Sequence, residues 1–357
     1  MKPSRCLGSV SFWLTAGENG IKMKLTDTRG ERLLVDLFCT LGPACENVDL
    51  LCEMLRLGMT GVRLNLSHGS LVSASARLQH LREAECITGI SAKLLVDLQG
   101  PELRIGDLPN TILLQEGQTV CIPDDIPMPK LVTDVLKKGR ELLLDDGKLQ
   151  LEMLDSGQTI VKRGGMLQSR KSIALPGLEL NSPALTEEDL ENISHLPEFG
   201  VTGVMQPFVR SGEDLQYLRS ALENAGCGGL RIYAKIENQR GIARLPEILP
   251  EADEIVIARG DLGNAVPLWE LPAAQKKIAA ACREVGKPFM VVTQMLASME
   301  HSPVPTRAEV SDVFNAVLDG AASVMVTGET AVGKFPTNVV AYLASTVNAA
   351  QRYLMEL

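Results

Sequence analysis

The chain has 357 residues, of which 45% are hydrophobic, and a formal net charge of −9. That length fits two domains or one α/β barrel with an insertion, and the apolar share suffices for a large core. The negative charge argues against nucleic acid as a main partner, because phosphate binding needs a basic face. No apolar run reaches the roughly 18 residues of a membrane helix, so no membrane partner is expected. The eight cysteines contain no CxxC pair, which indicates reduced thiols and a cytoplasmic protein.

The first 30 residues are interpreted as an uncleaved N-terminal arm, because Gly, Ser and Trp interrupt their weak apolar stretch. From about residue 33 onward, short apolar runs alternate with helix-like segments. The runs are mostly continuous rather than alternating, as expected of strands in a buried parallel sheet. They occupy residues 33–42, 61–67, 92–100, 203–208, 231–238, 254–261, 288–295 and 323–330. Eight such βα units predict an α/β fold, the TIM (β/α)8 barrel.

The stretch of about 100 residues between the third and fourth runs is too long for one βα connection. Its first part, including "TILLQEGQTVCIPDD" (111–125) and "RELLLDDGKLQLEML" (140–154), alternates apolar and polar residues around turn pairs. That texture predicts a small antiparallel β-barrel, and helical texture resumes where Thr186 and Asp189 make a capping pair. The sequence therefore predicts an arm at 1–30, a barrel formed by 31–104 and 174–357, and a lid domain at 105–173 inserted after the third strand.

The predicted strands end in polar and charged side chains. In this fold the active site lies at the C-terminal ends of the strands, so these side chains should converge. A barrel mouth with several cations and carboxylates is too costly to be mere core. The strand-end residues, in chain order, are Thr40, Pro43, Arg63, Asn65, Ser67, His68, Asp97, Glu102, Arg104, Lys235, Glu237, Arg259, Gly260, Asp261 and Thr293.

The residue types indicate a chemistry. Glu237 and Asp261 end neighbouring strands and offer hard oxygen ligands that suit Mg²⁺ or Mn²⁺. Lys235 and Arg63 would face an anion, as a transferring phosphoryl group requires. The turn "ARGDLG" (258–263) offers backbone N–H groups that could hold a carboxylate, although an ordinary glycine turn fits this stretch equally well.

From about Leu33 to the C-terminus, the chain carries several specific motifs. They are "CTLGPA" (39–44), "VRLNLSHG" (62–69), "VDLQGPELRIG" (96–106), "LLDDGKLQL" (143–151), "ALPG" (174–177), "AKIEN" (234–238), "ARGDLG" (258–263), "VTQMLASM" (292–299), "PTRAEVSDVFNAVLDGA" (305–321) and "TGETAVGKFP" (327–336). By these motifs the chain resembles the pyruvate kinase family. The resemblance implies a glycolytic, ATP-binding phosphotransferase that uses Mg²⁺ and K⁺. Its reaction would be phosphoenolpyruvate + ADP + H⁺ → pyruvate + ATP.

Residue by residue, the resemblance implies specific roles. Glu237 and Asp261 match the ligands of Mg²⁺ (or Mn²⁺), and Lys235 and Arg63 match the cations that contact the phosphoryl group. The backbone at Gly260 and Asp261 resembles the cradle of the substrate carboxylate, and Thr293 matches the threonine near the methylene carbon, where enolpyruvate is protonated. The K⁺ site would consist of Asn65, Ser67, Asp97 and the carbonyl of Leu98. Positions around the nucleotide phosphates match Thr40, Pro43, Asn65, His68, Arg104 and Lys171.

Departures from the family pattern leave alternatives open. Leu98-Gln99 stands where the family has Thr-Lys, the lid is short, and no aromatic residue for adenine is recognisable in 70–75. Ala174 and Ala265 replace a usual Asn and Glu. The chain also ends after the eighth barrel helix, so control through the family's C-terminal domain is not expected, whereas a homodimer through the barrel is possible. The alternatives are another pyruvate-enolate reaction (oxaloacetate decarboxylation, a lyase or aldol step, or phosphoryl transfer to a non-ADP acceptor) and a non-catalytic paralogue.

Overall fold

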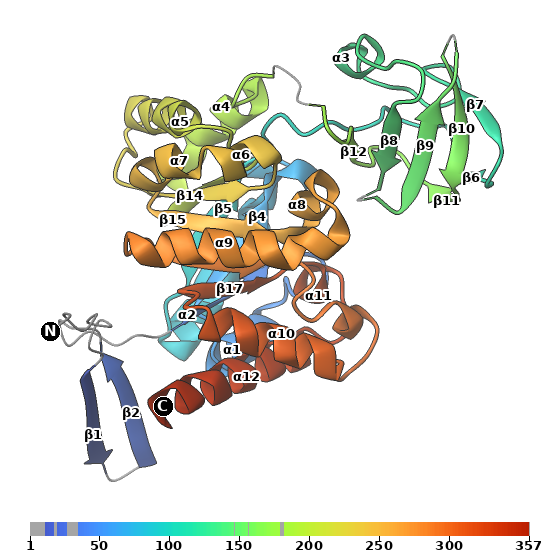
Figure 1. Ribbon diagram of the computed structural model, residues 1–357. Coiled ribbons are helices and arrows are strands. Elements are labelled where there is room, and N and C mark those ends of the chain that lie inside the picture. The colour runs from blue at the N-terminus through green and yellow to red at the C-terminus, as the bar shows by residue number, and fades with distance from the viewer. Residues whose placement is uncertain are drawn as a thin grey trace, which may run out of the picture.

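The computed structural model describes residues 11–17, 20–26, 35–145, 147–155, 157–178 and 182–356, with only the backbone described for 11–17, 20–26 and His68. The predicted arm, residues 1–30, therefore lies largely outside the described residues. Within it, β1 (Ser11–Gly17) and β2 (Gly20–Thr26) form an antiparallel pair (Figure 1). In the part of the chain that is described, no helix is both long and apolar enough to cross a membrane.

The main body is a closed barrel of eight parallel strands, which confirms the predicted α/β fold (Figure 1). The ring closes where β17 pairs with β3, with Ser323 opposite Asp36. Every run predicted as a barrel strand contains one of these strands. They are β3 (Asp36–Thr40), β4 (Gly61–Asn65), β5 (Lys93–Asp97), β13 (Gly203–Gln206), β14 (Arg231–Ile236), β15 (Glu254–Ala258), β16 (Phe289–Val292) and β17 (Ser323–Val326).

Helices cover the outside of the barrel. They are α1 (Val48–Arg56), α2 (Ser75–Thr88), α4 (Glu187–His195), α5 (Gly212–Asn224), α6 (Gln239–Ala243), α7 (Leu245–Glu251), α8 (Arg259–Ala265), α9 (Leu271–Glu284), α10 (Arg307–Leu318), α11 (Gly328–Ala331) and α12 (Pro336–Glu356). Several begin at side-chain caps that satisfy free N–H groups of the first turn. The predicted pair of Thr186 and Asp189 is a reciprocal capping box at α4, and Thr306 with Glu309 forms another at α10.

The inside of the barrel is a packed core. Side chains from seven of the eight strands fill it, and all are nearly or fully buried: Phe38, Leu95, Met205, Tyr233, Val256, Ala258, Met290, Val292 and Met325. Burying each larger apolar side chain contributes roughly 1.5–3 kcal/mol relative to leaving it exposed. A second, larger apolar layer lies between the strands and the helices. Because the interior is filled, a substrate can bind only at the ends of the strands.

Most of the residues between β5 and α4 build a separate antiparallel unit with its own apolar core (Figure 1). Its elements are β6 (Ile112–Leu114), β7 (Thr119–Cys121), α3 (Lys130–Thr133), β8 (Glu141–Leu144), β9 (Leu149–Met153), β10 (Gln158–Arg163), β11 (Gly165–Leu167) and β12 (Ile173–Ala174). The alternation seen in the sequence arises because one face of each strand packs on this core. Instead of one closed barrel, the described residues form a five-stranded sheet and a two-stranded sheet.

Two segments running side by side connect this unit, called the lid below, to the barrel. Arg104 and Ser172 form an antiparallel bridge, and the Ile105 amide donates to the Lys171 carbonyl at 3.0 Å. Since both segments leave from the region between β5 and β13, the lid stands at the C-terminal ends of the barrel strands (Figure 1). The precise limits of the lid, residues 105–173, stay a prediction.

Candidate active site

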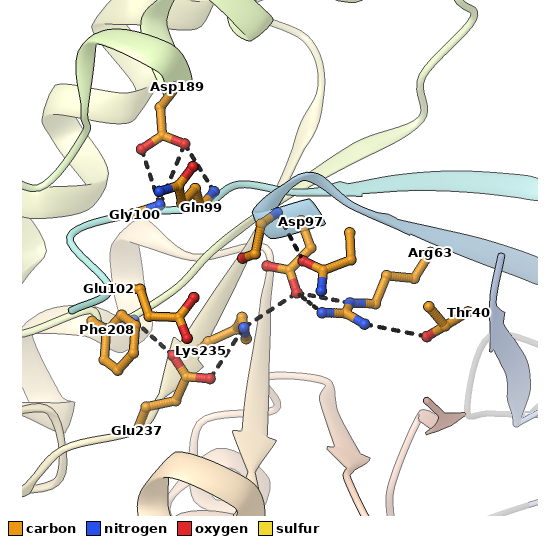
Figure 2. Close-up of polar contacts among 12 residues, drawn as sticks. Thr40, Arg63, Asp97, Gln99, Gly100, Glu102, Asp189, Phe208, Lys235 and Glu237 are labelled. Atoms are coloured by element: carbon orange, nitrogen blue, oxygen red, sulfur yellow. Dashed lines mark hydrogen bonds and ion pairs between the residues drawn. The ribbon is translucent and has the colours of Figure 1, made fainter. Parts of the chain in front are cut away.

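Asp97 lies at the centre of the barrel mouth and holds two cations (Figure 2). It is the last residue of β5 and is 1% exposed. Its Oδ2 atom accepts from Arg63 Nε at 2.7 Å and Nη2 at 2.6 Å, and from Lys235 Nζ at 3.2 Å. Arg63 comes from the adjacent strand β4, and Lys235 reaches across from β14. One carboxylate oxygen therefore fixes both predicted phosphoryl-binding cations.

Lys235 also contacts Glu237, the predicted metal ligand. Lys235 Nζ lies 3.1 Å from Glu237 Oε1, and the Phe208 amide donates to Glu237 Oε2 at 2.8 Å (Figure 2). Burial lowers the pKa of Lys235, but the carboxylates of Asp97 and Glu237 outweigh it, so the pKa lies above its usual value. Burial raises the pKa of Glu237, and the Lys235 ammonium offsets only part of that effect. Lys235 is therefore charged at neutral pH.

We call Thr40, Arg63, Asp97, Lys235 and Glu237 the Asp97 cluster. Thr40 is buried at the end of β3, where its hydroxyl accepts from Arg63 Nη1 at 3.3 Å and donates to the Val326 carbonyl at 3.1 Å. The cluster thus joins strand ends from β3, β4, β5 and β14. The convergence expected from the barrel topology is present for these five residues.

A cavity of about 320 Å³ adjoins the cluster and lies between the barrel and the lid. The carboxylates of Glu102, Glu237 and Asp261 line it, together with apolar side chains from both parts of the chain. Those apolar residues are Pro101, Leu103, Leu143, Ile173, Ala174, Leu175, Pro176, Leu178, Phe208 and Ala265. The cavity therefore combines carboxylates that could bind a metal ion with a mostly apolar wall.

The two predicted metal ligands, Glu237 and Asp261, suit a divalent cation that also binds water or substrate oxygens. Both side chains line the same cavity and offer hard oxygen atoms. Within the described residues, no group of three or more His, Cys, Asp and Glu side chains could hold a metal by itself. A site of two carboxylates needs substrate and water oxygens for its remaining positions, which is how Mg²⁺ is commonly held at phosphate sites.

The second oxygen of Asp97 fits a monovalent cation. Asp97 Oδ1 is buried, and no hydrogen bond reaches it from the part of the chain that the structure describes. Asn65 is the register partner of Asp97 on β4, and its side chain accepts from the Ser67 amide at 3.2 Å. A buried carboxylate oxygen without a donor is costly unless a cation or water satisfies it. The residues predicted for K⁺ thus contain an atom that requires such a partner.

The predicted substrate and proton-transfer residues lie beside one another. Gly260 and Asp261 are in the first turn of α8, and Thr293 follows β16. A Cβ added to Gly260 would lie 3.1 Å from Thr293 Cγ2, so glycine permits this close approach. Thr293 is half-buried and is not among the residues that line the cavity.

The residues predicted to bind the nucleotide do not converge on one site as the Asp97 cluster does. Pro43 is exposed, and the side chain of His68 lies outside what is described. Arg104 and Lys171 lie where the lid joins the barrel and already have acidic partners. Arg104 pairs with Glu102 at 2.8 Å, and Lys171 pairs with Asp145 at 2.8 Å.

Phe208 is a site residue to which the sequence gave no role. Its φ of +53° is unusual for a side chain of this size, and it places the amide against Glu237. The preceding Pro207 packs closely on Gly100, where a Cβ would meet Pro207 Cγ at 2.5 Å. This packing holds the turn that orients Glu237. The strand-ending "QPF" marks a turn but does not reveal the hydrogen bond.

Asp189 is a second residue whose role was missed. The sequence predicted only its capping of α4, but its fully buried carboxylate also accepts from the amides of Gln99 and Gly100 at 2.9 and 3.0 Å (Figure 2). It thereby ties the loop after Asp97 to α4. The capping motif gave no signal for this contact across 89 residues.

Comparison with known proteins agrees with the geometry. The family model "Pyruvate kinase, barrel domain" matches residues 34–340. Pyruvate kinase of Geobacillus stearothermophilus is 40% identical over 85% of this chain, and that of Bacillus licheniformis is 36% identical over 89%. Pyruvate kinase of Kluyveromyces lactis is 36% identical over 95% of this chain and is covered over 70% of its own length. The chain spans only 54% and 57% of the two bacterial relatives. This chain belongs to the pyruvate kinase family.

Proposed function

We propose that this chain catalyses phosphoryl transfer between phosphoenolpyruvate and ADP, giving pyruvate and ATP. One observation carries the proposal: Lys235 lies between Asp97 and Glu237, and Glu237 shares a cavity with Asp261. This arrangement sets a fixed positive charge beside Glu237, which together with Asp261 suits a divalent cation. Phosphoryl transfer depends mainly on such positioning and charge stabilisation.

We assign a separate role in this reaction to each group of residues at the barrel mouth. Lys235 and Arg63 would contact the oxygens of the transferring phosphoryl group, where Asp97 holds both in place before substrate binds. The backbone N–H groups at the start of α8, around Gly260 and Asp261, would hold the substrate carboxylate. Thr293, which packs against Gly260, would lie near the methylene carbon that receives a proton after the phosphoryl group leaves.

We assign the cations to the oxygen donors described above. Glu237 and Asp261 would hold Mg²⁺ or Mn²⁺, and Asn65, Ser67, Asp97 and the carbonyl of Leu98 would hold K⁺. When bound, these cations supply positive charge to the enolate and phosphoryl oxygens. The orphaned Asp97 Oδ1 supports the monovalent site, and the shared cavity of the two carboxylates supports the divalent site.

The nucleotide side supports a second candidate, namely enolate chemistry or phosphoryl transfer with a partner other than ADP. Arg104 and Lys171, which would meet nucleotide phosphates, are each paired with a carboxylate. Beside the acidic end of the cavity, Ala174 and Ala265 contribute apolar wall. Ala174 and Ala265 are also positions at which the sequence departs from the family pattern.

A turnover assay tests the proposal. Purified protein with phosphoenolpyruvate, ADP, Mg²⁺ and K⁺ should form equal amounts of pyruvate and ATP. Lys235→Met should lower the rate roughly 10²–10³-fold, as loss of one preorganised electrostatic group does. Lys138→Met, which removes an exposed lysine of the lid, is the matched control and should keep full activity. Full activity of Lys235→Met would refute the site, and pyruvate from oxaloacetate alone would favour the second candidate.

We further propose a cytoplasmic protein that forms a homodimer through the barrel. The free state of the seven cysteines among the described residues supports a reducing compartment. Light scattering on the purified chain tests the dimer, because the mass should be twice 38.6 kDa.

A further inference from the structure

Arg259 is a half-buried arginine behind the active site whose guanidinium binds two different elements. Its Nε and Nη2 atoms donate to the Thr293 carbonyl at 3.2 and 2.8 Å. Its Nη1 atom lies 2.8 and 2.7 Å from the two carboxylate oxygens of Asp312 on α10. The side chain is only 12% exposed, and it is not among the residues that line the cavity. These contacts place Arg259 to act on Thr293.

Thr293 has a backbone conformation that needs such support. Its φ is +79°, and the next residue, Gln294, has a φ of +55°. A β-branched residue in this region is a genuine outlier, and it persists only where surrounding contacts determine it. Two hydrogen bonds from one guanidinium to the Thr293 carbonyl are contacts of that kind. The same conformation brings the Thr293 methyl group against Gly260.

We propose that Arg259 is a positioning residue, which holds Thr293 over Gly260 for the proton transfer at carbon, and that Asp312 anchors Arg259. The inference rests on the proposed function, in which Thr293 lies near the methylene carbon of the substrate. The three residues come from α8, the end of β16 and α10, so the anchor extends from the helical layer to the reacting carbon. It gives α10 a part in the chemistry beyond packing.

The step that Arg259 supports can be followed without any nucleotide. When pyruvate enolises, a methyl C–H bond breaks and the proton leaves to solvent. The C–H electron pair forms the C=C bond, and the carbonyl π pair moves onto the oxygen to give the enolate. In D₂O a deuteron then adds to the same carbon, and no oxidant, reductant or phosphoryl acceptor is needed. Loss of the methyl proton signal of pyruvate measures this exchange directly.

A double-mutant cycle tests the inference on the whole chain with pyruvate, Mg²⁺ and K⁺ in D₂O. Arg259→Met should slow exchange roughly 10²-fold, as a misplacement of about 1 Å does, while the KM for pyruvate changes less than about 3-fold. Thr293→Val should cause a loss of similar size. If Arg259 acts through Thr293, the double variant should be no more than about 3-fold slower than Thr293→Val. Independent roles predict a combined loss of roughly 10⁴-fold, which would overturn the inference.

Two conservative variants guard against misfolding. Arg259→Lys keeps a charge near Asp312 but cannot donate two hydrogen bonds to Thr293. Its exchange rate should therefore fall about 10-fold or more. Asp312→Asn leaves the contacts between Arg259 and Thr293 in place, so its exchange rate should fall less than about 10-fold. Arg219→Met is the matched control, because Arg219 also donates to backbone carbonyl oxygen and to an aspartate, but at the opposite ends of the strands. Exchange at the wild-type rate in Arg259→Lys, or an equal loss in Arg219→Met, would refute the positioning role.

The same experiment separates this inference from the proposed function. A wild-type chain that makes ATP from phosphoenolpyruvate but exchanges no methyl protons overturns the inference alone. A chain that exchanges protons and shows the expected cycle, but makes no ATP, overturns the ADP reaction and supports the inference. A chain with neither reaction overturns both.

Discussion

Replacement of Asp97 by Asn tests whether one carboxylate holds the cationic side of the active site. The change keeps the shape of the side chain and removes its charge. With an effective dielectric constant of about 20, the attraction of Asp97 Oδ2 is about 6 kcal/mol for Arg63 at 2.6 Å and about 5 kcal/mol for Lys235 at 3.2 Å. Desolvation of the three groups offsets most of this, since Arg63 is 12% and Lys235 13% exposed.

The net cost follows from what the two cations keep. Arg63 retains the Thr40 hydroxyl, and Lys235 retains Glu237. Loss of one partner from a buried pair typically costs 3–5 kcal/mol, so we expect about 3 kcal/mol, the lower end, for Asp97→Asn. Turnover should fall roughly 10²-fold, because Lys235 and Arg63 are no longer held in one geometry.

Urea unfolding and steady-state turnover measure the two effects. Asp155→Asn is the control, since it breaks an exposed pair with Lys138 and should leave both quantities unchanged. Lys235→Met and its combination with Asp97→Asn complete a cycle, in which the double variant should be less destabilised than the sum of the single ones. The reasoning is wrong if Asp97→Asn unfolds like the control or if the two substitutions are additive.

Three further predictions address other parts of the chain. If the proposed function holds, Glu237→Gln should lower pyruvate formation at least roughly 10²-fold at saturating Mg²⁺, because it removes a carboxylate beside the proposed phosphoryl site; undiminished turnover would contradict this prediction. Burial raises the pKa of Glu254 from 4.5 to about 6, and the Ser323 hydroxyl offsets only part of this, so stability falls as pH rises from about 4.5 to 6 and stays lower above that range. Glu254→Gln should therefore add about 2 kcal/mol to the free energy of unfolding at pH 8 and nothing at pH 4, and a gain independent of pH would contradict this. Asp189→Ala should cost about 2 kcal/mol, because the Gly100 amide loses its buried acceptor; thermal unfolding at the wild-type temperature would exclude this.

The sequence predicted the site residues that depend on topology. A strand in a parallel barrel ends at the mouth, so the positions of Lys235, Glu237 and Arg63 follow from the βα alternation alone. Their convergence needed no knowledge of side-chain geometry. The same reasoning explains why every predicted strand was found, since continuous apolar runs leave few alternatives for a buried strand.

The contacts that orient those residues could not be predicted in this way. Phe208 reaches Glu237 only through a positive φ, and nothing in "QPF" specifies that conformation. Asp189 binds Gly100 across 89 residues, and a local capping motif gives no information at that range. Arg259 stands two residues before Asp261 in the sequence, but its side chain pairs with Asp312 on α10. Such contacts depend on tertiary packing, which periodicity does not encode.

The two carboxylate oxygens of Asp97 have different surroundings at the barrel mouth. Oδ2 accepts from both Arg63 and Lys235, whereas Oδ1 is buried without a donor among the described residues. Under the proposed function, a cation near Oδ1 would withdraw charge from the same carboxylate that holds Lys235 and Arg63, the side chains proposed to contact the phosphoryl group. The attraction of Asp97 for Lys235 and Arg63 would weaken accordingly, and more of their positive charge would face the substrate. In the proposed reaction, a monovalent cation held by Asp97 would therefore assist phosphoryl transfer through Lys235 and Arg63.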